Sequence, residues 1–233
     1  MRADMSEPRW PAQRGRERYE SLLNIDIAAR LAHGGTWLDV GPGVDALPMR
    51  PFLDRADVSL VCVGPHPRSL PSPIDFTLGT IPDDATFLGR WSGRATLVTD
   101  VYGSVSYSDD PLLAIACCVL LLAPGGTFAA FTELQRIGGL ETWDRAIQWF
   151  RRDLQVTLTL QAVSIFEDAS QSFATGLRIL ATRDSVTHVD IATTAAQLRT
   201  EVGTPVASAT LWEAADRSAR ISRVDYWKPS RGR

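Results

Sequence analysis

The sequence stretch that decides the fold is Thr36–Gly43, which reads Thr-Trp-Leu-Asp-Val-Gly-Pro-Gly. Large apolar and β-branched residues lead to an acid at Asp39, and the run then breaks on two glycines. This pattern predicts a buried strand that ends in a tight turn. Glycine at Gly41 and Gly43 permits positive φ and lets a ligand approach the backbone where a Cβ would collide. Because open parallel sheets bind ligands at the carboxyl ends of their strands, Asp39 is a candidate binding residue.

The composition is that of an ordinary globular protein. The chain has 233 residues, of which 45% are hydrophobic and 22% charged, so one domain with a terminal extension is the simplest expectation. A net charge of −3 argues against a protein that binds phosphate backbones. The three cysteines lie in apolar runs, and no histidine lies near the adjacent pair Cys117-Cys118, which favours buried thiols over a disulfide framework or a zinc site. We find no apolar run of membrane-span length and no signal-peptide core, and we therefore expect a cytoplasmic location.

Short apolar runs alternate with helical patterns along the first two thirds of the chain, which predicts a parallel α/β sheet. The further strands expected are Val58–Val63, Ile74–Leu78, Ala95–Val101 and Thr127–Phe131. A four-residue recurrence predicts one helix through Tyr19, Leu23, Ile27 and Leu31.

Prolines and aspartates predict where two of the helices in this region break or begin. The helix expected after Gly43 should be short or broken, because Pro48 and Pro51 interrupt it. The run Leu112–Leu122 predicts a buried helix capped by Asp109 or Asp110.

The last third of the chain has a different pattern. An amphipathic helix over Leu140–Leu154 is followed by two long β runs, Val156–Phe166 and Phe173–Thr182, which should pair as an antiparallel addition at the sheet edge. The tail Val189–Lys228 predicts a strand, a helix over Thr193–Val202 and a further strand or two. Its apolar residues favour a segment packed on the domain.

We therefore expect three parts. They are a flexible arm (residues 1–17), a ligand-binding domain (18–183) and a packed C-terminal extension (184–233).

Two ligand classes can be weighed against the glycine turn. Gly41-x-Gly43-x-x-Ala46 formally matches the dinucleotide fingerprint, in which a helix N-terminus holds a pyrophosphate. Three features disagree: the prolines cut that helix, Asp45 would repel the phosphates, and no acid ends the second strand. A cationic ligand without phosphates suits the site better, because Asp39 and Asp100 would both lie at strand ends.

An ordered set of motifs resembles one known family. Leu38–Gly43 is similar to motif I of the class I S-adenosylmethionine-dependent methyltransferases. The resemblance continues through Gly79–Pro82, Leu97–Tyr107 and the turn Leu122–Thr127, and covers roughly residues 20–182. It implies a Rossmann-like, seven-stranded, mostly parallel sheet with helices on both faces and an antiparallel late strand.

The resemblance also implies roles for individual residues. Asp39 would orient the methionine ammonium of S-adenosylmethionine, and Gly41, Pro42 and Gly43 would pass beneath the cofactor. Thr80 and Ile81 would flank the adenine. Asp100, Val101 and Tyr102 would lie where the methyl group is transferred. The candidate catalytic residues are Asp100, Tyr102 and Tyr107, and His66 and Glu133 are further candidate bases.

Two positions depart from the family pattern. The second strand usually ends in an acid that binds the ribose hydroxyls, and Gly64 stands there, with His66 nearby as a partial substitute. Thr80 replaces the acid of a common Gly-Asp pair after the third strand. The loss of charged hydrogen bonds to two hydroxyls would cost on the order of 2–3 kcal/mol.

The sequence thus predicts a methyltransferase that acts on a small molecule or peptide by in-line transfer, with S-adenosylmethionine as cofactor. One alternative is a non-catalytic, methyltransferase-like binding or regulatory subunit, and a second is an NAD(P)-dependent oxidoreductase. We expect no metal, no nucleic-acid partner and no membrane partner.

Overall fold

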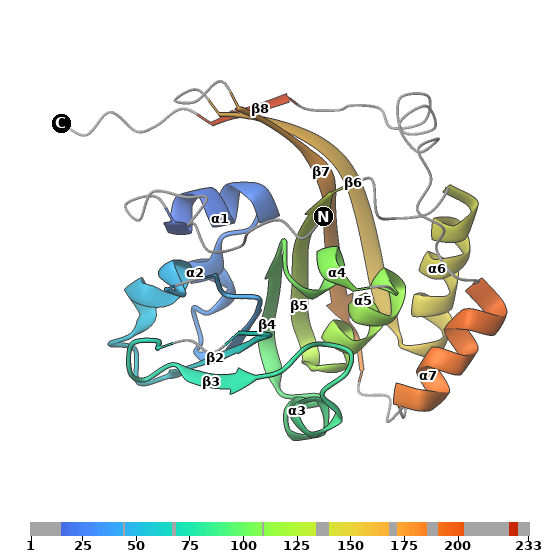
Figure 1. Ribbon diagram of the computed structural model, residues 1–233, viewed down its shortest axis with the longest axis horizontal. Coiled ribbons are helices and arrows are strands. Elements are labelled where there is room, and N and C mark those ends of the chain that lie inside the picture. Colours follow the sequence, from blue (N-terminus) through green and yellow to red (C-terminus); the bar gives the residue numbers. More distant parts are fainter. Residues whose placement is uncertain are drawn as a thin grey trace.

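The computed structural model describes residues 15–43, 45–66, 69–108, 110–133, 140–167, 172–185, 191–202 and 224–227. These residues contain β1 (Gly35–Val40), β2 (Val58–Gly64), β3 (Asp75–Leu78), β4 (Ala95–Val101), β5 (Leu122–Glu133), β6 (Val156–Glu167), β7 (Ser172–Arg183) and β8 (Val224–Trp227). All of them belong to one sheet with the order β3-β2-β1-β4-β5-β7-β6-β8 (Figure 1).

The strand directions confirm the predicted fold class. β1 pairs in parallel with β2 and β4, and β5 pairs in parallel with β4. β7 runs antiparallel to both of its neighbours, β5 and β6. The sheet has one strand more than the seven expected, because β8 pairs in parallel with β6 at the outer edge.

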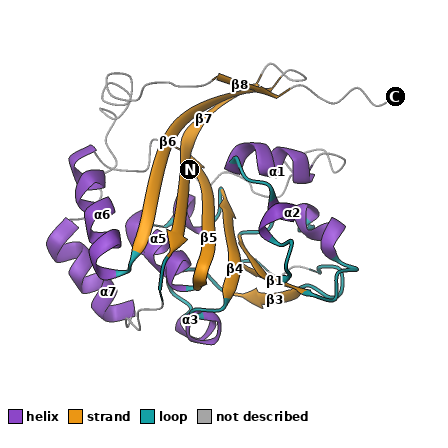
Figure 2. Cartoon of the chain, turned by 180° about the vertical axis from the view of Figure 1, so that it is seen from behind, coloured by secondary structure: helices purple, strands orange, loops and turns teal. Residues whose placement is uncertain are grey.

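Helices cover both faces of the sheet (Figure 2). On one face, α1 (Gly15–Leu23), α2 (Ile27–Arg30) and the 3₁₀ helix η2 (Leu47–Phe52) pack over one apolar cluster. On the other face, α3 (Ala85–Trp91), α5 (Pro111–Leu120) and α6 (Leu140–Asp153) pack over a second cluster. The central strands are buried from both sides, which explains why their sequences are continuous apolar runs.

The single helix expected through Tyr19 and Leu31 is wrong. The chain forms α1 and α2 instead, and they are separated at Asn24, whose φ of 55° cannot continue a right-handed helix. Asp26 then caps α2 by accepting a hydrogen bond from Ala29 N at 2.9 Å. The four-residue recurrence survived the break because both short helices present their apolar side chains to the same core.

The start of α1 also bears on the N-terminal arm. Gly15–Glu17 are helical, although the expected flexible arm includes them, and the rest of that arm lies outside the described residues.

The segment after β1 is short, as the prolines predicted. η2 spans six residues, and Pro51 lies inside it. This replaces the long helix that a dinucleotide-binding fold places after its first strand.

α5 confirms the buried helix, with Asp110 as its cap. Asp110 accepts a hydrogen bond from Leu113 N at 3.1 Å, whereas Asp109 lies outside the described residues. Every residue of α5 is buried, because β5 and β7 contact it on one side and α7 (Ile191–Gln197) contacts it as well.

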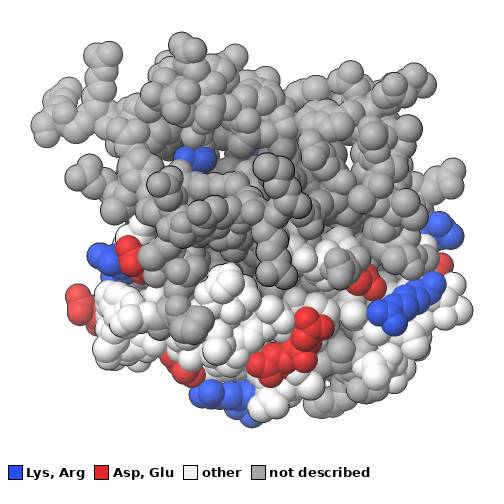
Figure 3. Space-filling model, viewed as in Figure 1, with Lys and Arg blue, Asp and Glu red and all other residues white. Residues whose placement is uncertain are grey.

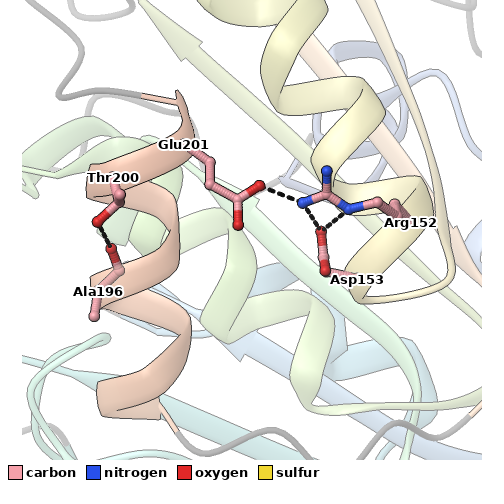
Figure 4. Close-up of polar contacts among 5 residues, drawn as sticks. All are labelled: Arg152, Asp153, Ala196, Thr200 and Glu201. Atoms are coloured by element: carbon pink, nitrogen blue, oxygen red, sulfur yellow. Dashed lines mark hydrogen bonds and ion pairs between the residues drawn. The ribbon is translucent and has the colours of Figure 1, made fainter.

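The tail contributes α7, the single π-helical turn η4 (Leu198–Val202) and β8. Leu198 and Val202 are buried in the core cluster beneath α5 and α6. Glu201 accepts a hydrogen bond from Arg152 of α6 across the surface (Figure 4). The prediction of a strand at the start of the tail is wrong at Ile191, which is the first residue of α7. Leu211 and Trp212 lie outside the described residues.

Short helical turns also shape the sheet's carboxyl edge. α4 (Ser104–Tyr107) follows β4 after a two-residue turn. Figure 1 shows α1 and α4 on the side of the sheet towards which β4 points.

In the described part of the chain, no helix is both long and apolar enough to cross a membrane.

Candidate functional site

A cavity of about 530 Å³ opens where β1, β2 and β4 end. Each of the three strands contributes the residues at its carboxyl end or directly after it, which is where parallel α/β sheets bind ligands. The structure brings the following predicted site residues together in its lining: Gly41, Pro42, Gly43, Gly64, His66, Thr80, Ile81, Val101, Tyr102 and Tyr107.

Two predicted residues do not line the cavity. Asp39 and Asp100 are both fully buried behind its wall. The roles expected for them toward a cofactor and a substrate stay predictions. Gly41 and Gly103, which follow β1 and β4, are in the lining instead.

The turns after β1 and β4 are packed directly against each other. A Cβ on Gly41 would lie 2.8 Å from Gly103 Cα, and Gly41 has a φ of 88°. Gly43 has a φ of 67°, but a Cβ there would meet no heavy atom within 4 Å. Gly41 is therefore required by the protein's own packing, whereas Gly43 leaves backbone open to a ligand.

Asp39 is held by a hydrogen-bond network at the end of β1. Its Oδ1 accepts hydrogen bonds from Tyr19 Oη and from Thr99 Oγ1, the latter at 3.0 Å. Trp37 Nε1 donates to Thr99 Oγ1 at 2.9 Å and fixes that hydroxyl. Asp39 Oδ2 has no hydrogen-bond partner among the described residues.

Burial decides the ionisation of these groups. Loss of solvation raises the pKa of Asp39 to about 6, although the hydrogen bonds from Tyr19 and Thr99 oppose the rise. Burial, together with the negative charge of Asp39, raises the pKa of Tyr19 well above its ordinary value. The phenol is therefore a stable donor to Asp39 at neutral pH.

Asp100 organises the turn after β4. Its two carboxylate oxygens accept hydrogen bonds from Gly103 N at 2.7 Å and Val105 N at 3.0 Å. Burial raises its pKa to about 7 against the effect of these bonds. With both oxygens turned to backbone amides, Asp100 holds the turn and the start of α4 in place. The catalytic role expected for it stays a prediction.

Tyr102 has an unusual backbone conformation at the cavity wall. Its φ is 54°, and its ring packs edge-on against Phe131 at 5.3 Å between centroids. Such a conformation in a residue other than glycine is a strained one, and strained residues concentrate at functional sites. Tyr107, on α4, is 49% exposed at the cavity mouth.

The opposite wall is made by the segment after β3. Ile81 is 2% exposed and belongs to the core as well as to the cavity lining. Thr80 Oγ1 donates to Asp83 Oδ2 at 3.0 Å, and Gly79 N donates to Gly64 O at 2.9 Å, which ties this segment to β2. His66 is exposed on the neighbouring loop.

The sequence reasoning missed several lining residues, the most important being Tyr19 of α1. It counted Tyr19 only as an apolar position, although a buried tyrosine hydroxyl usually finds a polar partner. Arg199, on η4, also reaches the cavity and lies 3.8 Å from Asp110. Nothing in the local sequence pairs a tail residue with this site.

The charged groups of the cavity are mainly acidic. Asp45, Asp83 and Asp110 line it, with Arg199 as the counter-charge from the tail. In the described part of the face drawn in Figure 3, acidic and basic side chains are interspersed without a continuous basic patch. Among the described residues, no group of His, Cys, Asp or Glu is placed to hold a metal ion.

The strand order and the antiparallel β7 agree with the Rossmann-like, mostly parallel sheet that the resemblance implies. No model of a known protein family matches the chain, and no curated protein matches it either.

Solved structures that resemble the chain include several methyltransferases. One is the targeted domain of a precorrin-6Y C5,15-methyltransferase from Corynebacterium diphtheriae, at 12% identity and a TM-score of 0.41, covering 74% of this chain and 97% of that one. The antibiotic-resistance methyltransferase Kmr matches at 17% identity and a TM-score of 0.44, covering 77% and 96%. A 16S rRNA methyltransferase of T. thermophilus in complex with AdoMet and guanosine matches at 14% identity and a TM-score of 0.38, covering 75% and 41%.

Proposed function

We propose that the protein is an S-adenosylmethionine-dependent methyltransferase that acts on a small molecule or peptide. The observation that carries this proposal is the shared cavity lining that unites the motif residues of the turns after β1, β2, β3 and β4. The order of the motifs along the chain and their position around one cavity are independent observations. Both fit a single ligand that carries a nucleoside and a positive charge.

Three features of the cavity fit S-adenosylmethionine. Gly43 leaves the backbone open to close approach, as a cofactor lying over the first turn requires. The buried carboxylate of Asp39 and the acidic side chains of the lining favour a ligand that carries positive charge. Ile81 offers an apolar surface to a base.

The same features disfavour a dinucleotide. The 3₁₀ helix η2 is too short to supply the helix N-terminus that stabilises a pyrophosphate. Asp45 lines the cavity beside the turn and would repel phosphate oxygens.

The chemistry demands little of the protein. When bound, S-adenosylmethionine supplies a methyl group activated by a sulfonium. The chain's part is to hold an acceptor in line with that methyl group and to exclude water, and a base is needed only for a protonated acceptor. Tyr102 and Tyr107, the last residue of α4, line the cavity, and in this proposal they contact the acceptor. The net charge of −3 favours a small molecule or peptide over RNA as that acceptor.

Calorimetric titration tests the proposal. We expect S-adenosylhomocysteine to bind at a single site and NAD not to bind. Tight binding of NAD without binding of S-adenosylhomocysteine would contradict it. Binding of the nucleoside without methyl transfer to any acceptor in a panel of small molecules and peptides would favour the alternative of a regulatory subunit.

A further inference from the structure

Arg199 is the cationic side chain that the tail brings to the cavity. It belongs to the cavity lining, and among the described residues no other lysine or arginine does. Its Nε lies 3.8 Å from Asp110 Oδ2, and Asp110 belongs to the same lining. The side chain of Arg199 is 62% exposed. The guanidinium therefore lies beside a second group of the cavity wall, within reach of a ligand.

The backbone that carries Arg199 is held in place on two sides. Arg199 is on the π-helical turn η4, and π-helical turns are rare and concentrate at functional sites. Leu198 and Val202 of the same turn are buried in the core. Glu201 accepts a hydrogen bond from Arg152 of α6 on the outer side (Figure 4). The fold thus fixes the main chain at this point, and the side chain of Arg199 is the part that adjusts to a ligand.

The guanidinium has hydrogen-bonding capacity that the described part of the protein does not use. An arginine head carries five N–H donors in a planar fork. The contact with Asp110 is longer than a hydrogen bond, and no hydrogen bond joins the Arg199 side chain to any described residue. A carboxylate matches such a fork, because two parallel N–H···O bonds join the two groups.

The acidic side chains of the lining are engaged with other partners. Asp110 Oδ1 caps α5. Asp45 Oδ2 lies 4.0 Å from Arg50 Nη2. Asp83 Oδ2 accepts a hydrogen bond from Thr80 Oγ1 at 3.0 Å. Because the charges elsewhere in the lining are acidic, an anionic group in this cavity is favoured only close to the guanidinium.

Arg199 also lies at the end of the cavity that the proposed function assigns to the acceptor. Tyr107, which contacts the acceptor in that proposal, is followed by Ser108, and both line the cavity. The Ser108 hydroxyl donates to Asp110 O and accepts a hydrogen bond from Asp110 N, both at 3.0 Å. These two bonds tie Asp110, and with it the Arg199 contact, to the end of α4.

We propose that Arg199 binds a carboxylate of the methyl acceptor, so that the substrate is a carboxylic acid or a peptide with a free carboxylate. The inference rests on the proposed function and adds the chemical class of the acceptor to it. In this arrangement the tail selects the substrate, whereas the turns after the strands hold the cofactor.

Calorimetric titration with two probes of matched shape tests the inference. They are 4-hydroxybenzoate and 4-hydroxybenzamide, and each is titrated into protein saturated with S-adenosylhomocysteine. We expect wild type to bind the acid about tenfold more tightly than the amide. Arg199→Gln should lose about tenfold in affinity for the acid, the effect of charge-assisted hydrogen bonding, and less than about twofold for the amide. Arg199→Lys keeps the charge without the fork and should lose an intermediate amount.

Arg90→Gln is the matched control. The Arg90 side chain, on α3, is 57% exposed and lies 2.9 Å from Asp75, and it does not belong to the cavity lining. This variant should leave the affinities for both probes unchanged. A loss for the acid equal to that in Arg199→Gln would show a general effect of net charge and overturn the inference.

Three further results would also overturn it: equal binding of acid and amide to wild type, binding of neither probe, or an equal loss of both probes in Arg199→Gln. The affinity for S-adenosylhomocysteine is measured first, and the three variants should match wild type. Failure of the probes alone then rejects the carboxylate subsite and keeps the proposed function. If S-adenosylhomocysteine does not bind to wild type, both are rejected.

Discussion

Asp39 is a carboxylate that the fold buries without a cation beside it. Among the described residues it has no ion pair, and its Oδ2 has no hydrogen-bond partner. A group of this kind opposes folding when it is ionised, because its solvation is lost. The proposed binding of a cationic ligand would offset this cost.

The pH dependence of stability follows from the raised pKa of Asp39. The folded state holds its proton up to about pH 6, whereas the unfolded state releases it near 3.8. This group's contribution to the free energy of unfolding therefore falls as the pH rises through that interval. Asp39→Asn keeps an oxygen for Tyr19 and Thr99 and removes the charge. We expect it to be more stable than wild type at about pH 8 by roughly 2–3 kcal/mol, and similar near pH 4.

Urea unfolding at the two pH values measures this difference. The same variant should bind S-adenosylhomocysteine more weakly, since the counter-charge is gone. If Asp39→Asn is no more stable than wild type at the higher pH, the account of Asp39 is contradicted.

Gly64 stands where the resembled family has its ribose-binding acid. Its φ is not positive, and a Cβ would make ordinary contacts at 3.6 Å with Pro42 Cδ and 3.8 Å with Phe76 Cε2. A Cβ is therefore accepted there at ordinary contact distances. We expect Gly64→Asp to tighten binding of S-adenosylhomocysteine by about tenfold or more, because a carboxylate would accept hydrogen bonds from two hydroxyls.

Gly64→Ala is the control for the added Cβ and should leave the affinity nearly unchanged. Calorimetric titration of both variants separates the two effects. An equal loss of affinity for S-adenosylhomocysteine in Gly64→Asp and Gly64→Ala would mean that this glycine does not occupy the ribose-binding position.

At the scale of elements, the tail is part of the core through its π-helical turn. Leu198 is 2% exposed in the cluster shared with α5 and α6. Leu198→Ala should lower the free energy of unfolding by about 2–4 kcal/mol, because it opens a cavity in that cluster. Equilibrium urea unfolding measures the loss.

The neighbouring Arg199 provides a control on the same turn. Its side chain is 62% exposed and lies 3.8 Å from Asp110, so Arg199→Ala should change stability by less than about 0.5 kcal/mol. A loss below about 1 kcal/mol in Leu198→Ala would mean that the tail contributes little to the core.

At the scale of the whole molecule, local patterns predicted most of the fold. The apolar runs bounded by glycine gave the strands of the parallel sheet, and the two adjacent long β runs gave the antiparallel β7. These features depend on sequence within a few residues of each other. The break at Asn24 was not predictable in this way, because both halves of the pattern face one core.

The candidate site was predictable only as far as the turns that form it. The sequence predicted the site residues that directly follow the strands, because the carboxyl ends of parallel strands meet at one edge of the sheet. The depth of Asp39 and Asp100 depends on α1 and on the packing of Gly41 against Gly103, which are contacts between distant segments. Tyr19 and Arg199 reach the cavity by the same kind of long-range packing, from opposite ends of the chain.

The most direct test of the central claim is a crystal structure of the protein grown with saturating S-adenosylhomocysteine. Our account predicts the ligand in the cavity, with its adenine beside Thr80 and Ile81 and its chain over Gly43. An empty cavity at saturating ligand, or a ligand bound elsewhere on the molecule, would contradict the account.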